Sequence, residues 1–182
     1  MDRTDIFRIA LNLFNMDYDS VIDGIEAIYC ENFLESAESV CAAIRDWPWL
    51  IRSKQFTEEE RLESSYHGLD YGYKVPDDMS YPYLVNGKHD DSIRWAGDCI
   101  YFSTENPRLD YITKEVEYKK MPTPYMMLIA SELAREIAPM IAPDSAVEKR
   151  ATSLFQSQLA TLIQMNIKGK RDKTPHKDFF VV

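Results

Sequence analysis

Two groups of consecutive residues are the parts of this sequence best suited to chemistry. One is His89, Asp90 and Asp91, and the other is Asp77 and Asp78. Imidazole and carboxylate groups can bind a metal ion or exchange protons with a substrate. Adjacent side chains point in different directions, however, and both groups lie close to proline, glycine or lysine in turn-like sequence. We therefore expect neither group to form a metal site or a catalytic site.

Motifs of known enzymes are missing as well. The sequence contains no GxSxG, GxxxxGK[ST], HExxH or GxGxxG, the patterns that present a nucleophile, a phosphate loop, a zinc site or a dinucleotide site. His67 and His176 have no partner at motif spacing. We therefore expect a protein that is not an enzyme and that carries no cofactor.

Tyrosines gather in the middle of the chain and indicate contact with another protein. Five of them fall within eighteen positions: Tyr66, Tyr71, Tyr73, Tyr81 and Tyr83. A small sheet cannot bury so many large rings within one subunit, and tyrosine favours interfaces. The alternative is that these rings cover one face of their own sheet.

The C-terminal segment, residues 167–182, is the second candidate interface. Its basic residues are Lys168, Lys170, Arg171, Lys173 and Lys177, and its apolar end is Phe179, Phe180, Val181 and Val182. Leaving that end in water is costly. We expect an arm whose basic stretch crosses an acidic neighbour and whose apolar end adds to a sheet edge or fills a pocket there. A frayed terminus is the alternative.

Composition and charge set the broad class. The 182 residues fit one domain that can bury a core without disulfides. A net charge of -9 argues against a nucleic-acid-binding protein, whose usual footprint is basic. Cys30, Cys41 and Cys99 are widely spaced, which favours reduced, buried thiols in a cytosolic compartment. No apolar run is long enough to span a membrane, and Met1–Ala10 does not resemble a signal peptide. We therefore expect a soluble protein without membrane contact.

Four helices are expected to position these surfaces. Apolar residues recur every three or four positions over residues 5–15, 21–47, 124–141 and 145–166. In the second helix, Ile25, Ile28 and Val40 belong to the spacing that predicts its core face. Trp47 precedes Pro48, which ends that helix.

The last two helices carry clear boundary signals. Thr123 and Pro124 are typical of a helix start, and Ser145 with Glu148 has the spacing of a capping box. Pro139 is expected to kink or end the third helix. The short connection that follows makes the two helices antiparallel neighbours.

Short runs rich in tyrosine and β-branched residues lie between the second and third helices. They predict strands at residues 72–75, 83–85, 100–103 and 109–116. Asn86-Gly87 is typical of a type I′ turn, Gly97 indicates a second turn, and Thr57 with Glu60 matches a capping box. The predicted fold is α+β and mainly α. A four-helix body, residues 1–166, carries a small antiparallel sheet at about 66–118 and is followed by the extended arm.

This order of elements, together with several short motifs, resembles a known family. The motifs are RDWPWLIRSK at 45–54, YKVPDD at 73–78, GDCIYFSTENPRLDYI at 97–112 and MPTPYMMLIASELAREIAP at 121–139, followed by the capped helix 145–166. In this order and spacing the chain resembles the head-to-tail connectors of short-tailed bacteriophages, a head-completion family often called adaptor or tail tubular protein A.

The resemblance implies a structural protein of the virion. Such a chain forms a ring of twelve copies beneath the portal protein, continues the DNA channel used in DNA ejection, and supports the downstream tail or nozzle proteins. It would reside in the neck and tail of the virion, after assembly in the host cytoplasm. Carboxylates facing the bore would repel phosphates, so that viral DNA passes without specific binding.

Two other functions remain open from the residues. A virion-associated peptidoglycan hydrolase would need two carboxylates roughly 5 to 9.5 Å apart around the glycosidic bond. A non-viral helical interaction module would stay monomeric in the presence of portal protein. Glycan-degrading activity and association with portal protein distinguish these alternatives from the connector.

Overall fold

The chain folds into two compact units. The computed structural model describes residues 2–89, 93–143 and 145–171. The helical unit comprises Met1–Ala43 and Glu117–Val182, and the β unit comprises Ile44–Val116. The fold is α+β and mainly helical, and the strands lie between the second and third helices, as predicted. The strands, expected as an insertion into a single domain, form a unit of their own.

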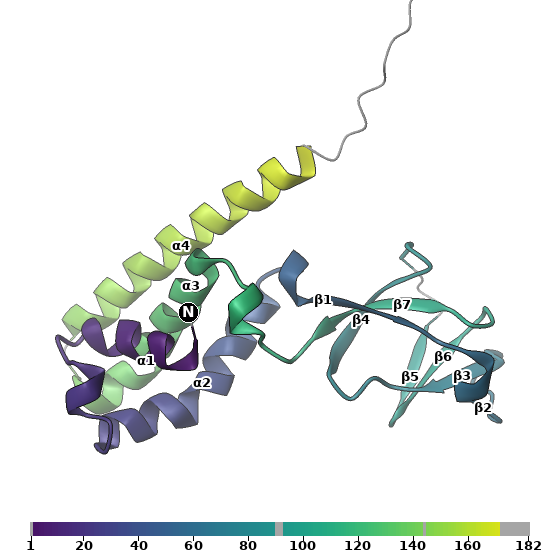
Figure 1. Cartoon of the computed structure of the whole chain (residues 1–182), viewed down its shortest axis with the longest axis horizontal. Helices are drawn as coiled ribbons and strands as arrows, with labels where there is room; N and C mark the ends of the chain where they lie inside the picture. The colour runs from purple at the N-terminus through teal and green to yellow at the C-terminus, as the bar shows by residue number, and fades with distance from the viewer. Residues whose placement is uncertain (1, 90–92, 144, 172–182) are drawn as a thin grey trace, which may run out of the picture. The chain divides into compact units, whose positions relative to one another are not determined.

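The helical unit is built around its third helix. Its helices are α1 (Arg3–Asn12), α2 (Ile25–Ala43), α3 (Thr123–Ile141) and α4 (Ser145–Arg171). Each of the other three packs against α3, and Figure 1 draws α4 and α2 on different sides of it. Most side chains of α3 are buried, including Tyr125, Met126, Ile129 and Leu133. An apolar surface this broad requires neighbours on several sides.

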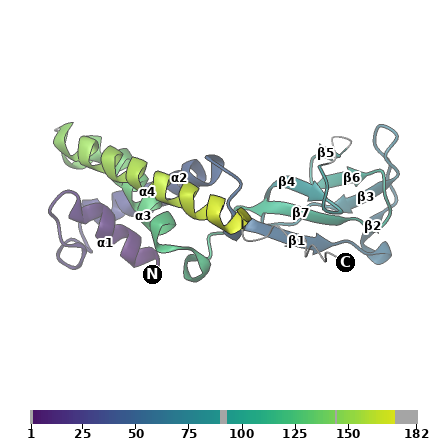
Figure 2. The ribbon, with the colours of Figure 1, turned by 90° about the horizontal axis from the view of Figure 1, so that it is seen from above.

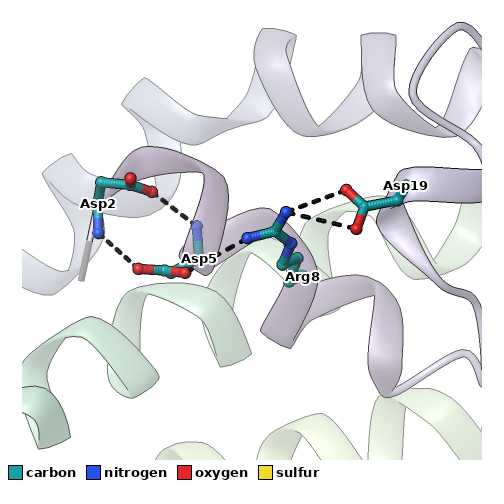
Figure 3. A network of polar contacts seen from close by, with 4 residues as sticks. All are labelled: Asp2, Asp5, Arg8 and Asp19. Atoms are coloured by element: carbon teal, nitrogen blue, oxygen red, sulfur yellow. Dashed lines mark hydrogen bonds and ion pairs between the residues drawn. The ribbon is translucent and has the colours of Figure 1, made fainter.

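Two aspartates decide where α1 begins. The Asp2 amide donates to Asp5 Oδ2 at 2.8 Å, and the Asp5 amide donates to Asp2 Oδ1 at 3.1 Å. This is a capping box, so the helix begins at Arg3 and not at the predicted Asp5. Figure 3 shows that Arg8 continues this network to Asp19, 3.0 Å away.

The second helix is shorter than predicted at both ends. It covers Ile25–Ala43, whereas the sequence pattern predicted residues 21–47. Tyr18–Ser20 forms a separate 3-10 turn before it. At the other end, Trp47 is extended before Pro48, as the steric rule for a residue before proline requires. Trp47 is buried and stacks on Trp49 with ring centroids 5.1 Å apart.

The last helix extends five residues beyond the predicted end. α4 continues to Arg171, so Lys168, Lys170 and Arg171 belong to a helix and the expectation of an extended arm from residue 167 is wrong there. Lysine and arginine are good helix formers, and the single Gly169 costs only about 1 kcal/mol. In α3, Pro139 lies inside the helix, which continues to Ile141 instead of ending at the proline.

The β unit contains two antiparallel sheets where the sequence predicted one. Its strands are β1 (Ile51–Gln55), β2 (Arg61–Leu62), β3 (Tyr71–Lys74), β4 (Met79–Val85), β5 (Arg94–Ala96), β6 (Cys99–Phe102) and β7 (Arg108–Thr113). One sheet has the order β1-β7-β4 and the other β2-β3-β6-β5. Figure 2 shows these strands from a second direction. The predicted strands correspond to β3, β4, β6 and β7.

The predicted turns of the β unit are confirmed. Asn86 and Gly87 both have positive φ, at 50° and 75°, and Val85 pairs with Lys88 across them. Gly97, with φ of 58°, joins β5 to β6. Thr57 and Glu60 form the expected capping box. These local signals are satisfied within two to four residues, which is why the sequence shows them directly.

Aromatic rings fill the core of the β unit. Phe56 lies 4.6 Å from the Tyr73 ring and 5.7 Å from the Phe102 ring, measured between centroids. Ile100 and Leu109 are buried in the same cluster. The β unit therefore has a core separate from the one around α3.

The hydroxyl of Tyr73 gives a test of this core. It accepts a hydrogen bond from the Asn106 amide at 3.0 Å. We expect Tyr73→Phe to lower the free energy of unfolding by about 1 kcal/mol, because that amide loses its acceptor. Urea denaturation measures the change, and Tyr66→Phe is the control. A variant that keeps wild-type stability but loses self-association would contradict the core position of Tyr73.

Candidate functional site

The five tyrosines that were expected at an interface have different environments. Tyr73 is 0% exposed, so the expectation that it contacts another chain is wrong. Its ring is needed to fill the space between Phe56 and Phe102. A sequence pattern cannot tell which tyrosine of a strand points inward until the register of the sheet is known.

The other four tyrosines retain part of their surface. Tyr66 is exposed and stacks on Tyr101, and Tyr71 lies under the Arg61 guanidinium. Both contacts lie within the β unit. These contacts agree in part with the alternative that the tyrosine rings cover their own sheet. Tyr66 is the most exposed of the five tyrosines.

Tyr81 and Tyr83 are half-buried on β4. The Tyr81 hydroxyl donates to Asp46 Oδ1 at 3.0 Å. Burial and that carboxylate raise the pKa of Tyr81 to about 12, so the hydroxyl stays protonated at neutral pH. The Tyr83 ring meets the His89 ring edge-on. Tyr81 therefore serves the β unit itself.

The candidate interface residues of the C-terminal segment fall into two groups, one up to Arg171 and one after it. Lys168, Lys170 and Arg171 lie in the last turns of α4. The remaining candidates, Lys173, Lys177, Phe179, Phe180, Val181 and Val182, lie outside the described residues.

Sequence reasoning missed an exposed apolar face on α2. Ile25, Ile28 and Val40 are 57%, 55% and 42% exposed, although their spacing predicted core positions. The residues of α2 that are buried are Ala27, Cys30, Leu34, Ala37 and Cys41. Both sets follow helical spacing, so α2 is apolar on two sides, and the pattern alone does not say which side meets α3.

We call this exposed surface the α2 face and define it by Ile25, Ile28, Asn32, Ser36 and Val40. Steps of three or four residues place these side chains on one side of the helix. None of the five is charged. Glu31 and Glu35, which are also exposed, lie three and seven residues after Ile28 and border the face. An apolar stripe beside carboxylates is therefore open to solvent.

Three carboxylates of α2 and α3 are withdrawn from solvent, Glu132 fully and Glu38 and Glu136 in part, and helical periodicity did not predict their partners. Glu132 is buried and pairs with Arg135 at 2.5 Å. Glu136 Oε1 accepts from the Ser36 hydroxyl at 2.9 Å, and Glu38 Oε1 accepts from the Tyr118 hydroxyl at 2.5 Å. A helical apolar pattern contains no signal for the Ser36–Glu136 and Glu38–Tyr118 bonds, because each joins residues far apart in the chain.

Burial changes the acidity of these groups. Desolvation raises the pKa of Glu136, and Glu132 nearby adds to the increase, while the Ser36 hydrogen bond opposes it. Desolvation likewise raises the pKa of Glu38 against the opposing Tyr118 hydrogen bond. The thiol of Cys30 is buried, which raises its pKa to about 12 and makes it a poor nucleophile.

The acidic groups considered for chemistry in the β unit have structural partners. Asp77 forms an ion pair with Lys74 at 3.1 Å. Asp78 accepts hydrogen bonds from the Tyr111 hydroxyl at 2.9 Å and the Thr113 hydroxyl at 3.1 Å. Asp90 and Asp91 lie outside the described residues, and within the described ranges no three His, Cys, Asp or Glu side chains gather closely enough to hold a metal ion.

Comparison with known proteins adds no relative. No protein-family model and no curated protein matches the chain. Among residues 2–89, 93–143 and 145–171, no helix combines the length and apolar character needed to cross a membrane.

The raised pKa of Glu136 predicts how stability depends on pH. Its carboxyl ionises at lower pH in the unfolded chain than in the folded one, so its contribution is complete below pH of about 4 and is lost as pH rises through the folded pKa. We expect Glu136→Gln, which keeps an acceptor for Ser36, to raise the melting temperature at pH 7 and to have little effect near pH 4.

Thermal unfolding between pH 4 and pH 8 measures this difference. Glu31→Gln, at an exposed position of the same helical unit, is the matched control and is expected to leave the melting temperature nearly unchanged. A stabilisation by Glu136→Gln that grows on acidification would contradict the assignment.

Proposed function

We propose that the chain is a structural, ring-forming head-to-tail connector of a short-tailed bacteriophage. In this role it docks beneath the portal protein, continues the DNA channel and provides the platform on which the tail is attached. The observation that carries the proposal is the α2 face, with Ile25, Ile28 and Val40 exposed on one side of a helix. Ile25 and Ile28 are neighbours on this side, Val40 lies beyond the uncharged Asn32 and Ser36, and exposed apolar residues gathered in this way favour a surface that binds another protein.

The arrangement of elements supports the same role. The family resemblance implies a helical body with strands inserted between the second and third helices, and the chain has this order. The net charge of -9 per copy would be multiplied around a ring. Carboxylates that face the bore would then repel DNA phosphates and limit sticking.

A hydrolytic role has less support. Glu132, which is buried, is paired with Arg135, and Glu136, which is half-buried, accepts a hydrogen bond from Ser36. Both lie on α3, whose side chains are covered by the other helices. A general acid must reach its substrate within hydrogen-bond distance, so these contacts favour a role in folding over one in glycan cleavage.

A charge placed on the α2 face tests the proposal. We expect Ile28→Glu to reduce ring formation on the cognate portal protein at least tenfold, because an unpaired charge would be buried in the contact. Symmetry counts on electron micrographs and native mass measurement report the rings, and circular dichroism reports the fold. Met165→Glu, at a 47% exposed apolar position of α4, is the control.

Two outcomes would contradict the proposal. One is a wild-type chain that forms no ring on the cognate portal protein. The other is a set of virus particles that lack the protein and still retain their genome and gain complete tails.

A further inference from the structure

We infer that the α2 face receives the C-terminal segment, residues 167–182, of a second copy of the chain. This inference rests on the proposed function and names the contact that would join neighbours in the ring. The apolar end, Phe179–Val182, would cover Ile25, Ile28 and Val40, and the basic residues of the segment would lie near the glutamates that border the face. Four observations support it.

The first observation is charge complementarity. Residues 1–43 contain nine acidic and two basic residues, and α2 itself has four glutamates and neither lysine nor arginine. The C-terminal segment contains five basic and two acidic residues. The strongest separation of charge along this chain therefore lies between the acceptor helix and the segment. Such opposite potentials steer association and disfavour other partners.

The second observation is apolar complementarity. The α2 face presents branched aliphatic side chains with uncharged Asn32 and Ser36 between them. The segment ends in two phenylalanines and two valines. Covering both surfaces removes apolar area from water, at roughly 25 cal/mol for each Å² buried. Docking of the segment on the α2 face would cover both apolar surfaces at once, whereas docking of the segment on a sheet edge would leave the α2 face open to solvent.

The third observation is length. α4 ends at Arg171, and eleven residues follow it. An extended chain of that length spans at most roughly 36 to 40 Å. α2 has 19 residues and is therefore about 28 Å long. The residues after α4 are long enough to lie along the whole face.

The fourth observation favours docking of the segment on a second copy over docking on its own chain. Apart from Ser36, whose hydroxyl reaches Glu136 of α3, the α2 face lies on the side of α2 away from the residues that are buried against the rest of the helical unit, and α4 packs on α3 from another side. The segment of the same chain therefore continues from a helix that lies on a different side of α3 from α2. Docking on a second copy joins two different surfaces, and repetition of such a contact builds a ring when the rotation between copies closes.

Cysteine trapping in the full chain tests this contact. The background carries Cys99→Ser, and Cys30 and Cys41 stay in place because both are buried. A chain with Ile28→Cys is mixed with a mass-tagged chain with Phe180→Cys on portal protein and oxidised mildly. We expect at least ten times more mixed covalent dimer than from a control mixture in which Met165→Cys replaces Ile28→Cys.

A chain that carries both Ile28→Cys and Phe180→Cys shows whether the segment on the α2 face comes from the same chain or from a second copy. Dimers and longer covalent series are the expected products. A monomer closed on itself would show that the segment folds back on its own α2 and would overturn the inference. Equal yields from the Ile28→Cys and Met165→Cys mixtures would also overturn it.

A pair of assembly variants separates this inference from the proposed function. We expect Phe179→Ser combined with Phe180→Ser to reduce ring formation about as much as Ile28→Glu. If Ile28→Glu breaks the ring and the phenylalanine variant does not, another surface covers the α2 face, so the inference fails and the connector stands. If neither variant affects the ring, the α2 face is not the contact and the inference fails, whereas a wild-type chain that forms no ring would contradict the connector itself.

Discussion

The burial of α3 is the constraint on which the rest of the helical unit depends. A helix that is apolar around most of its circumference cannot be stable beside a single neighbour, so α1, α2 and α4 each pack one side against it. Two of its buried polar side chains have local partners, because Ser131 donates to the Leu128 carbonyl and Glu132 pairs with Arg135. Apolar residues that do not face α3 are consequently left on the outside.

Two hydrogen bonds made by side chains of α2 determine which of its apolar residues face solvent. Ser36 bonds to Glu136 on α3, and Glu38 bonds to Tyr118 shortly before α3. Rotation of α2 by one residue, about 100°, would break both hydrogen bonds and bury charges without partners. The same contacts that hold α2 in place thus hold Ile25, Ile28 and Val40 toward solvent, where they are available to a partner.

Most elements of the fold could be predicted from sequence because their signals are local. Helical spacing located all four helices, and Asn86-Gly87 located a turn whose φ angles are positive. The strands β1, β2 and β5 were missed. β2 and β5 are very short, and β1, which reads Ile-Arg-Ser-Lys-Gln, has the polar composition of a loop. Their pairing depends on partners far along the chain, which a local pattern does not contain.

The candidate surface was less accessible to prediction for a related reason. Periodicity assigned Ile25 and Cys41 to the same buried stripe, although only Cys41 meets the core. Tyr73 and Tyr66 looked equivalent, and only the sheet register separates a buried ring from an exposed one. A helix with four glutamates, no basic residue and apolar positions on two sides was the available signal for an exposed face on α2.

The pairing of β1 with β7 has a consequence for how such a chain can change over time. Ile51 lies opposite Ile112 in the register, so the entry and the exit of the β unit are adjacent strands. A module whose two ends lie side by side can be enlarged, shortened or exchanged without a cut through the helices that carry it. The helical unit can therefore keep its own packing while the β unit diverges to match a different neighbour.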